Sequence, residues 1–225
     1  MPLMPLLSLG LDPTAENYVA VLAILGIAFM AFLGALYFAY VKLLRKGFRI
    51  PDMPAGSIVL VEGPVDSKKS RASHAFLVEK ALKGEKVAVI SFHKGVHEKF
   101  FQEKKLGGSG LVKVVEADNE LTDLGMTFSS LISWGAKIIY APILSEAIIK
   151  SKFDEVAKFV SFNTKKSKNA GVTVVFGVDT DSVPKTNVAA LEVMMDGVIE
   201  FKSDAGDFVR MKKNVLGEAS DWEPV

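Results

Sequence analysis

Residues 56–70 read Gly56-Ser-Ile-Val-Leu-Val-Glu-Gly-Pro-Val-Asp-Ser-Lys-Lys-Ser70. The β-branched residues at the start predict a strand near residues 57–62. A turn that contains glycine and proline follows, and the periodicity then predicts a helix near residues 70–83. A strand, a short loop and a helix in this order form the opening unit of a parallel α/β fold.

The same alternation of strands and helices continues towards the end of the chain. Apolar runs such as Lys86–Phe92 are continuous rather than alternating, which is typical of strands covered by helices on both faces. We therefore predict an α/β fold with a mostly parallel central sheet and a C-terminal β-hairpin over residues 197–202 and 208–212, joined by a turn rich in Gly and Asp. The other predicted strands lie near residues 57–62, 86–92, 111–117, 137–141 and 172–178, and the predicted helices near residues 70–83, 96–105, 121–133, 144–163 and 185–195.

The composition excludes several classes of protein. The 225 residues contain no cysteine, which excludes a disulfide scaffold, a thiolate metal site and a cysteine nucleophile. The chain has 27 Lys+Arg against 26 Asp+Glu, so no broad basic face argues for a nucleic-acid partner. A single glutamine and a surface rich in Lys and Glu favour a thermophilic, archaeal-looking source.

An apolar segment precedes the α/β region. Residues 18–40 contain no charged residue, and a helix of that length spans about 34 Å, enough for a hydrocarbon core of about 30 Å. We predict a transmembrane helix over residues 18–41, after a short extracytoplasmic N-terminus over residues 1–17. A basic juxtamembrane linker over residues 42–56 then leads to one globular domain over residues 57–225.

The flanking charges predict the orientation in the membrane. Lys42, Arg45, Lys46 and Arg49 follow the apolar segment, whereas residues 1–17 contain no Lys or Arg. An excess of Lys and Arg marks the cytoplasmic flank, so we expect a single-pass protein of the cell membrane with its N-terminus outside and its C-terminal domain in the cytoplasm. A secretory signal peptide would have a basic start and a shorter apolar run. The four cations also suit anionic lipid headgroups.

The loop after the first predicted strand matches most of a phosphate-binding loop. That loop has the pattern G-x-x-x-x-G-K-[ST], in which backbone N–H groups bind the anion, the lysine reaches the outer phosphates and the hydroxyl helps to hold Mg²⁺. This chain supplies Gly63, Lys69 and Ser70, but Lys68 stands in place of the second glycine, where the backbone must pass close to phosphate. Gly63, Lys68, Lys69 and Ser70 are the candidate cofactor-binding residues. The alternative is a cationic turn that binds no ligand.

At this point the chain resembles the KaiC-like branch of the RecA superfamily of P-loop ATPases. Four segments carry the resemblance, which covers residues 55–213. They are Gly56–Pro64 at the strand entering the loop, Phe76–Phe92 at the next helix and strand, Ala136–Glu146 at the Walker B strand and Leu191–Phe201 at the turn into the last hairpin. The resemblance implies a RecA/KaiC-like P-loop fold, ATP or ADP as the candidate cofactor and oligomerisation as in the ring-forming relatives.

The chain departs from this resemblance where catalysis would occur. Members that hydrolyse ATP have an acidic pair after the second strand, where this chain has His93 and Lys94, and an Asp at the end of the Walker B strand, where it has Ala141 and Pro142. Phosphoryl transfer relies on positioning and charge compensation by such groups. His93 and His97 have the spacing of zinc ligands but lack a convincing third ligand. We therefore predict a degenerate ATPase with no catalytic residue and no metal site.

Two further pairs of residues are open to more than one interpretation. Arg210 and Lys212 occupy positions comparable to a basic pair that, in the resembling family, reaches the nucleotide of a neighbouring subunit. We favour solvent-facing hairpin charges for both residues. Asp179 and Asp181 stand at the end of a predicted strand, where α/β sheets tend to bind ligands, and we favour turn residues for this pair.

These observations lead to one main hypothesis about function. We predict a membrane-anchored, catalytically degenerate KaiC-like P-loop protein that acts on the cytoplasmic face as a scaffold, regulator or nucleotide sensor, with little or no ATP hydrolysis. The alternative is an active ATPase with a rearranged site, in which Asp66, Glu146 or Asp179 replaces the missing carboxylates. A third hypothesis is a purely structural assembly protein whose loop binds nothing.

The expected partners follow from the same features. They are the membrane, through residues 18–41, and a protein whose identity the sequence leaves open. A homo-oligomer is a further candidate, because Ala31, Ala35 and Ala39 share one helix face and would let two helices approach closely.

Overall fold

The computed structural model describes residues 26–34, 48, 50–203, 207–213 and 219–225. The chain divides into two compact units, Met1–Lys46 and Gly47–Val225. In the first unit, residues 26–34 are helical, and the rest of the predicted transmembrane segment and N-terminus lies outside the described residues. No helix within the described ranges is both long and apolar enough to cross a membrane.

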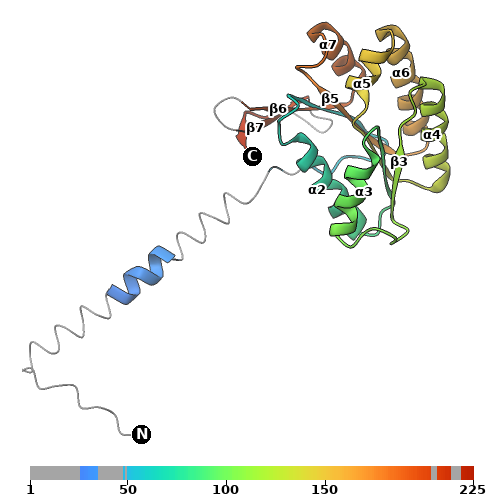
Figure 1. Ribbon diagram of the computed structural model, residues 1–225. Coiled ribbons are helices and arrows are strands. Elements are labelled where there is room, and N and C mark those ends of the chain that lie inside the picture. The colour runs from blue at the N-terminus through green and yellow to red at the C-terminus, as the bar shows by residue number, and fades with distance from the viewer. Residues whose placement is uncertain (1–25, 35–47, 49, 204–206, 214–218) are drawn as a thin grey trace, which may run out of the picture. The chain divides into compact units, whose positions relative to one another are not determined.

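The second unit is built on a single sheet whose strand order is β3-β2-β4-β5-β1-β6-β7-β8 (Figure 1). Strands β1 to β6 pair with one another in parallel, whereas the β6–β7 and β7–β8 pairs are antiparallel. This arrangement confirms the predicted α/β fold with a mostly parallel sheet and a C-terminal hairpin. The strands are β1 (Ile58–Gly63), β2 (Val87–Ser91), β3 (Val112–Glu116), β4 (Ile138–Ala141), β5 (Thr173–Asp179), β6 (Gly197–Lys202), β7 (Phe208–Lys213) and β8 (Glu223–Pro224).

Helices cover both faces of the sheet, and each face has its own apolar core. The helices are α2 (Lys69–Leu82), α3 (Lys94–Glu103), α4 (Leu121–Trp134), α5 (Leu144–Lys150), α6 (Phe153–Asn169) and α7 (Lys185–Met194). Side chains of α2 and α3, such as Leu77 and Phe101, pack against Val59 and Val61 of β1. Side chains of α4 to α7 pack against Ile58 and Leu60. Successive side chains of β1 therefore point into opposite cores, as expected for a strand that is buried on both faces.

One predicted helix is two helices in the structure. The sequence predicts a continuous helix over residues 144–163, but α5 ends at Lys150 and α6 begins at Phe153. The intervening Ser151 and Lys152 are extended. Acidic residues then occupy the first turn of α6, which favours a helix N-terminus there. The prediction missed the break because both helices face the same core and so continue one apolar pattern.

The segment before β1, which the sequence predicts as part of the linker, packs on the domain where it is described. Ile50 is only 5% exposed, and the ring of Phe48 meets the ring of Phe201 edge-on. The carboxylate of Asp52 lies 2.8 Å from Nζ of Lys80 on α2. The chain therefore enters the domain along the face that carries α2.

Candidate functional site

The predicted loop lies where the sheet brings several strand ends together. Residues 64–68 connect β1 to α2, and Gly63 pairs in register with Asp179 at the end of β5. Gly63 has a φ of 154°, and a Cβ at this position would lie 2.8 Å from the backbone oxygen of Phe201. Only glycine fits this close approach. The structure thus explains Gly63 by packing of the loop against β6 as well as by the predicted phosphate-binding pattern.

Lys69, the candidate phosphate ligand, is turned back onto its own loop. Its side chain is 7% exposed, and Nζ donates to the carbonyl oxygens of Gly63, at 3.0 Å, and Pro64, at 2.5 Å. The same Nζ lies 2.6 Å from Oδ1 of Asp179. The backbone N–H of Asp179 in turn donates to the Ser145 hydroxyl of α5 at 2.7 Å. The cation that a phosphate would approach is therefore neutralised by a positioned carboxylate of the same chain.

Asp181 supplies a second internal ligand for the loop. Its carboxylate accepts a hydrogen bond from the backbone N–H of Val65 at 3.2 Å. A further bond, from the N–H of Thr180 to the carbonyl of Gly63, joins the end of β5 to the end of β1. Asp179 ends β5 and Asp181 lies in the turn that follows, as the favoured interpretation has it. The parallel pairing of β1 and β5 also places both carboxylates at the loop, where they bind Lys69 and the N–H of Val65.

Lys68, at the position of the missing glycine, is directed to the C-terminal part of the domain. Its Nζ lies 3.1 Å from Oδ2 of Asp207 and donates to the carbonyl oxygen of Val225 at 2.6 Å. The hydrogen bond from Lys68, followed by one from Ser203, lowers the pKa of Asp207. The structure therefore separates Lys68 from Lys69, and each of these cations has a carboxylate partner.

Ser70 and the end of β4 complete this side of the site. Tyr140 of β4 is buried, and its burial raises the pKa of its hydroxyl to about 12, against the opposing effect of the Ser73 and Ser70 hydroxyls. The turn after β4 packs tightly against β5, because a Cβ on Gly177 of β5 would lie 3.0 Å from Cα of Pro142. Tyr140 and Pro142 therefore supply no carboxylate at the end of β4, and of these groups only the Ser70 hydroxyl fits a magnesium ion.

The end of β2 carries no acidic pair, as the sequence indicates. His93 is 72% exposed on its side chain, and its Nε2 lies 3.8 Å from Oε1 of Glu146 on α5. Lys94 pairs with Glu98 one turn further along α3 at 3.5 Å. Of the three carboxylates that the sequence offers as replacements, Glu146 is the one that lies near the end of β2, where it contacts His93.

His93 and His97 do not form a joint site. His97 is buried, and its Nδ1 lies 2.7 Å from Nε2 of His74 on α2, while its Nε2 lies 3.0 Å from the hydroxyl of Ser91. Burial lowers the pKa of both His74 and His97 to about 4. Within the described ranges, no group of three His, Asp or Glu side chains is arranged to hold a metal ion.

The sequence reasoning overlooked His74. A signal was present, because His74 shares one face of α2 with the apolar Leu77 three residues later, and both are buried. Its partner on α3 becomes apparent only when the two helices lie side by side on the sheet.

The basic residues of β7 are bound within the same chain. Nζ of Lys212 lies 2.9 Å from Glu192 of α7 and 3.3 Å from Glu62 of β1. Arg210 pairs with Glu200 of β6 at 2.6 Å, and its guanidinium lies 4.6 Å from the ring centroid of Trp222. Arg210 and Lys212 thus lie on the hairpin with 34% and 35% of their side chains exposed, and each is also paired with a carboxylate of its own chain.

Glu62 is the most deeply buried carboxylate of this group. Its side chain is 2% exposed, and Oε2 has no hydrogen-bond partner among the described residues. Burial, with the nearby carboxylate of Glu192, raises the pKa of Glu62 to about 7, although Lys212 opposes the shift. The sequence did not predict the burial of Glu62, because a strand residue directly before a loop is often exposed to solvent.

Comparison with known proteins supports the fold. No protein-family profile and no curated protein sequence matches this chain. Among solved structures, it resembles a KaiC-like protein from the hyperthermophilic archaeon Pyrococcus horikoshii, with a TM-score of 0.63 and 14% sequence identity over 76% of this chain and 86% of that chain. The unit Gly47–Val225 therefore shares the fold of this KaiC-like protein, an α/β fold with a mostly parallel sheet.

Proposed function

We propose that this protein is a membrane-anchored, non-hydrolysing relative of KaiC-like P-loop proteins, which acts by binding at the cytoplasmic face as a scaffold, regulator or nucleotide sensor. The observation that carries the proposal is the pairing of Lys69 with Asp179 at 2.6 Å. A loop cation held by its own chain provides no open site for the outer phosphates of ATP. The strand ends of β2 and β4 add no carboxylate pair that would activate water or position magnesium.

Nucleotide binding in this proposal is a competition between anions. A phosphate group that reaches Lys69 must displace the Asp179 carboxylate, and one that reaches the N–H of Val65 must displace Asp181. The loop therefore binds a nucleotide only if the phosphates repay the loss of these internal bonds. This competition makes the protein a sensor of high nucleotide concentration or of a partner that withdraws Asp179.

Thermal unfolding of the purified domain, with and without ATP, ADP and Mg²⁺, tests this competition. We expect the wild-type domain to show little shift of its melting temperature at millimolar nucleotide, and Asp179→Asn to show a clear shift. Ligand at 100 times its Kd contributes about 2.7 kcal/mol to the folded state. Asp66→Asn removes a carboxylate from the same loop without touching the Lys69 pair, and is the matched control. A large wild-type shift that Asp179→Asn abolishes would reject the competition.

An active ATPase with a rearranged site is the second candidate function, and the same contact favours it. Asp179 is one of the carboxylates that the sequence offers as a replacement, and it lies beside Lys69. In this alternative, Asp179→Asn and Lys69→Ala would both abolish a magnesium-dependent turnover of ATP. A steady-state phosphate-release assay distinguishes the two candidates, because the non-hydrolysing protein has no turnover to lose.

Membrane anchoring is proposed from the uncharged segment of residues 18–40 and the cations that follow it. The described helical residues 26–34 carry large exposed apolar side chains, which suit a lipid environment. These are Ile27, Phe29, Met30, Phe32 and Leu33. Extraction of membranes from cells with alkaline carbonate should leave the full chain in the pellet and release residues 47–225 expressed alone. Release of the full chain by carbonate would contradict the anchor.

Association with other chains completes the proposal. We propose a homo-oligomer or a complex with another protein, because a binding protein without turnover needs a partner to transmit its state. Sedimentation of the full chain in detergent measures whether it forms a homo-oligomer. A monomer at all concentrations would contradict the homo-oligomer and leave only the complex with another protein.

A further inference from the structure

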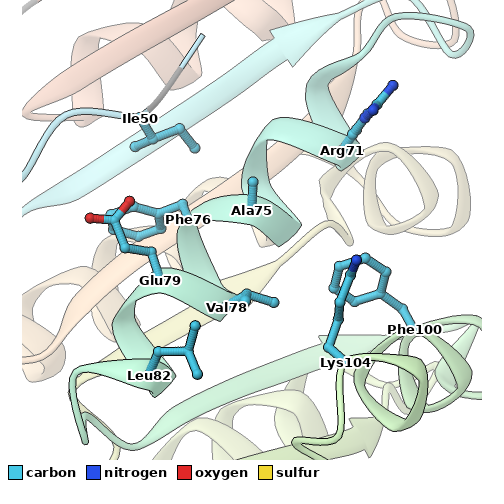
Figure 2. A pocket seen from close by; sticks show the side chains of 9 residues that line it. All are labelled: Ile50, Arg71, Ala75, Phe76, Val78, Glu79, Leu82, Phe100 and Lys104. Carbon is cyan, nitrogen blue, oxygen red and sulfur yellow. The ribbon is translucent and has the colours of Figure 1, made fainter. Parts of the chain in front are cut away.

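A groove with a volume of about 430 Å³ lies between the outer surfaces of α2 and α3. Figure 2 shows α2 with Arg71, Ala75, Val78 and Leu82 along one side. Phe100 of α3 and Lys104, which directly follows α3, face them. Ile50, from the segment that precedes β1, lies at the margin of the groove. The groove belongs to the domain surface and is separate from the loop site.

The groove combines an apolar lining with a basic rim. Phe76 and Phe100 line it together with Val78, and Leu82 is 72% exposed beside them. Arg71 and Lys104 supply exposed cations from the two opposite helices. The only acidic lining residue, Glu79, pairs with Lys83 at 3.0 Å, so the rim remains cationic. An amphipathic ligand with an anionic head and an apolar tail matches this distribution.

The length of chain between the uncharged run and Ile50 limits how far the groove can lie from the predicted membrane segment. Ile50 follows Tyr40, the last residue of the uncharged run, by ten residues, and ten residues span at most about 35 Å. Lys42, Arg45, Lys46 and Arg49 lie in this interval. A groove lined by Ile50 thus stays within reach of the bilayer surface whenever the N-terminal helix is inserted.

We propose that the α2–α3 groove docks on the membrane and takes the headgroup and part of an acyl chain of an anionic lipid. Arg71 and Lys104 bind the phosphate of the headgroup, and the side chains of Val78, Leu82 and Phe100 contact the chain. This inference rests on the proposed membrane anchoring, which keeps the groove at the surface. Docking restricts how the domain can turn on its tether, and so determines which faces remain available to a cytoplasmic partner.

Two comparisons favour the lipid as occupant. Residues 50–225 contain 23 Lys+Arg and 24 Asp+Glu, so the domain as a whole is not drawn to an anionic surface and attraction must come from a local cluster. A second groove, between α4 and α6, also has exposed apolar residues, Met126 and Phe162, and cations, Lys158 and Lys166. No residue of the entering segment lines that groove.

Vesicle flotation of residues 47–225 tests the proposal without the anchor. This fragment contains every described residue of both apolar cores, so it keeps its fold. We expect it to float with vesicles of phosphatidylglycerol and not with vesicles of phosphatidylcholine. Arg71→Gln/Lys104→Gln should weaken partitioning about 30-fold, since each basic residue contributes about 1 kcal/mol at an anionic surface. Leu82→Gln, at an exposed position, should weaken it about fivefold through lost apolar contact.

The matched control is Lys158→Gln/Lys166→Gln, which removes the same charge from the second groove and should leave partitioning unchanged. Equal weakening by both double variants would overturn the proposal, as would binding of the wild-type fragment to neither kind of vesicle or to both equally. Melting temperatures of all variants report whether the fold is kept. Carbonate extraction of the full chain remains a separate measurement, so failure of the anchor and failure of the groove give different results.

Discussion

Beneath α2 and α3 the sheet buries His74, His97 and Ser91, whereas on the face that carries α7 it buries Glu62 against Lys212 and Glu192. The first network is made of uncharged groups joined by short hydrogen bonds. The second holds a carboxylate whose Oε2 has no partner among the described residues. Both networks lie next to positions that the resemblance links to ATP hydrolysis, namely the end of β2 and the basic pair of β7.

The difference shows two ways in which a fold can accommodate buried polar groups at such positions. At the end of β2 the buried polar groups satisfy one another without charge, and burial lowers the pKa of both histidines to about 4. At β7 the basic residues are engaged by carboxylates, and burial raises the pKa of Glu62 to about 7. The two networks therefore give the stability of the fold opposite dependences on pH.

The largest expected effect is the loss of stability on acidification through the histidine pair. In the folded state both rings are neutral, whereas in the unfolded chain they take up protons below about pH 6.5. Stability from this pair is therefore full above pH 6.5 and is lost as the pH falls towards 4, by up to about 1.4 kcal/mol per pH unit for each histidine. Urea unfolding at several pH values measures this slope. His74→Phe/His97→Leu should flatten it, and an equally steep slope in that variant would contradict the assignment.

Removal of the cation from the charged network should have the next largest effect. Lys212→Met leaves Glu62 buried without its positive partner, which we expect to cost about 3 kcal/mol at pH 8. The cost should shrink at pH 5, where Glu62 is protonated. Lys185→Met, an exposed substitution at the start of α7, is the control and should change the free energy of unfolding by less than about 0.5 kcal/mol. A loss for Lys212→Met that is equal at pH 5 and pH 8 would show that charge pairing is not its cause.

Replacement of the buried carboxylate should remove the pH dependence that this network gives to the free energy of unfolding. Because the folded pKa of Glu62 is raised from 4.5 to about 7, its contribution is full below pH 4.5 and is lost as the pH rises towards 7. Glu62→Gln removes this dependence, so its stability relative to the wild type should increase by about 3 kcal/mol between pH 4.5 and 8. Paired urea titrations at the two pH values measure the difference. If the two proteins differ in free energy of unfolding by the same amount at both pH values, the Glu62 carboxylate is in contact with solvent and its pKa is not raised.

The smallest expected effect concerns the end of the uncharged network. Ser91 binds Nε2 of His97 at 3.0 Å and accepts the N–H of His93 at the same distance. Ser91→Ala should cost about 1–2 kcal/mol, because two buried polar groups lose their partner. Ser129→Ala, which removes a half-buried hydroxyl on α4, is a matched control with a smaller expected cost. An unchanged melting temperature for Ser91→Ala would show that water replaces the hydroxyl.

Much of the fold could be predicted because its determinants are local. Runs such as Lys86–Phe92 show strands through continuous apolar character, and the glycine-containing turn after residues 57–62 shows where a helix begins. The division of residues 144–163 into α5 and α6 was missed, since one apolar period runs through both helices. The loop itself was located, but the partners of its lysines were not.

Residue type and local spacing thus determined that the chain has an apolar N-terminal segment, an α/β domain with a mostly parallel sheet, and no acidic residue at positions 93–94 and 141–142 where two of its strands end. Only tertiary structure decided that Asp179 neutralises Lys69, that His74 meets His97 and that Glu62 is buried beside Lys212. These pairs are separated by 110, 23 and 150 residues. Which groups meet across such intervals depends on strand order and helix packing, and those arise from the burial of the whole sheet rather than from any one segment.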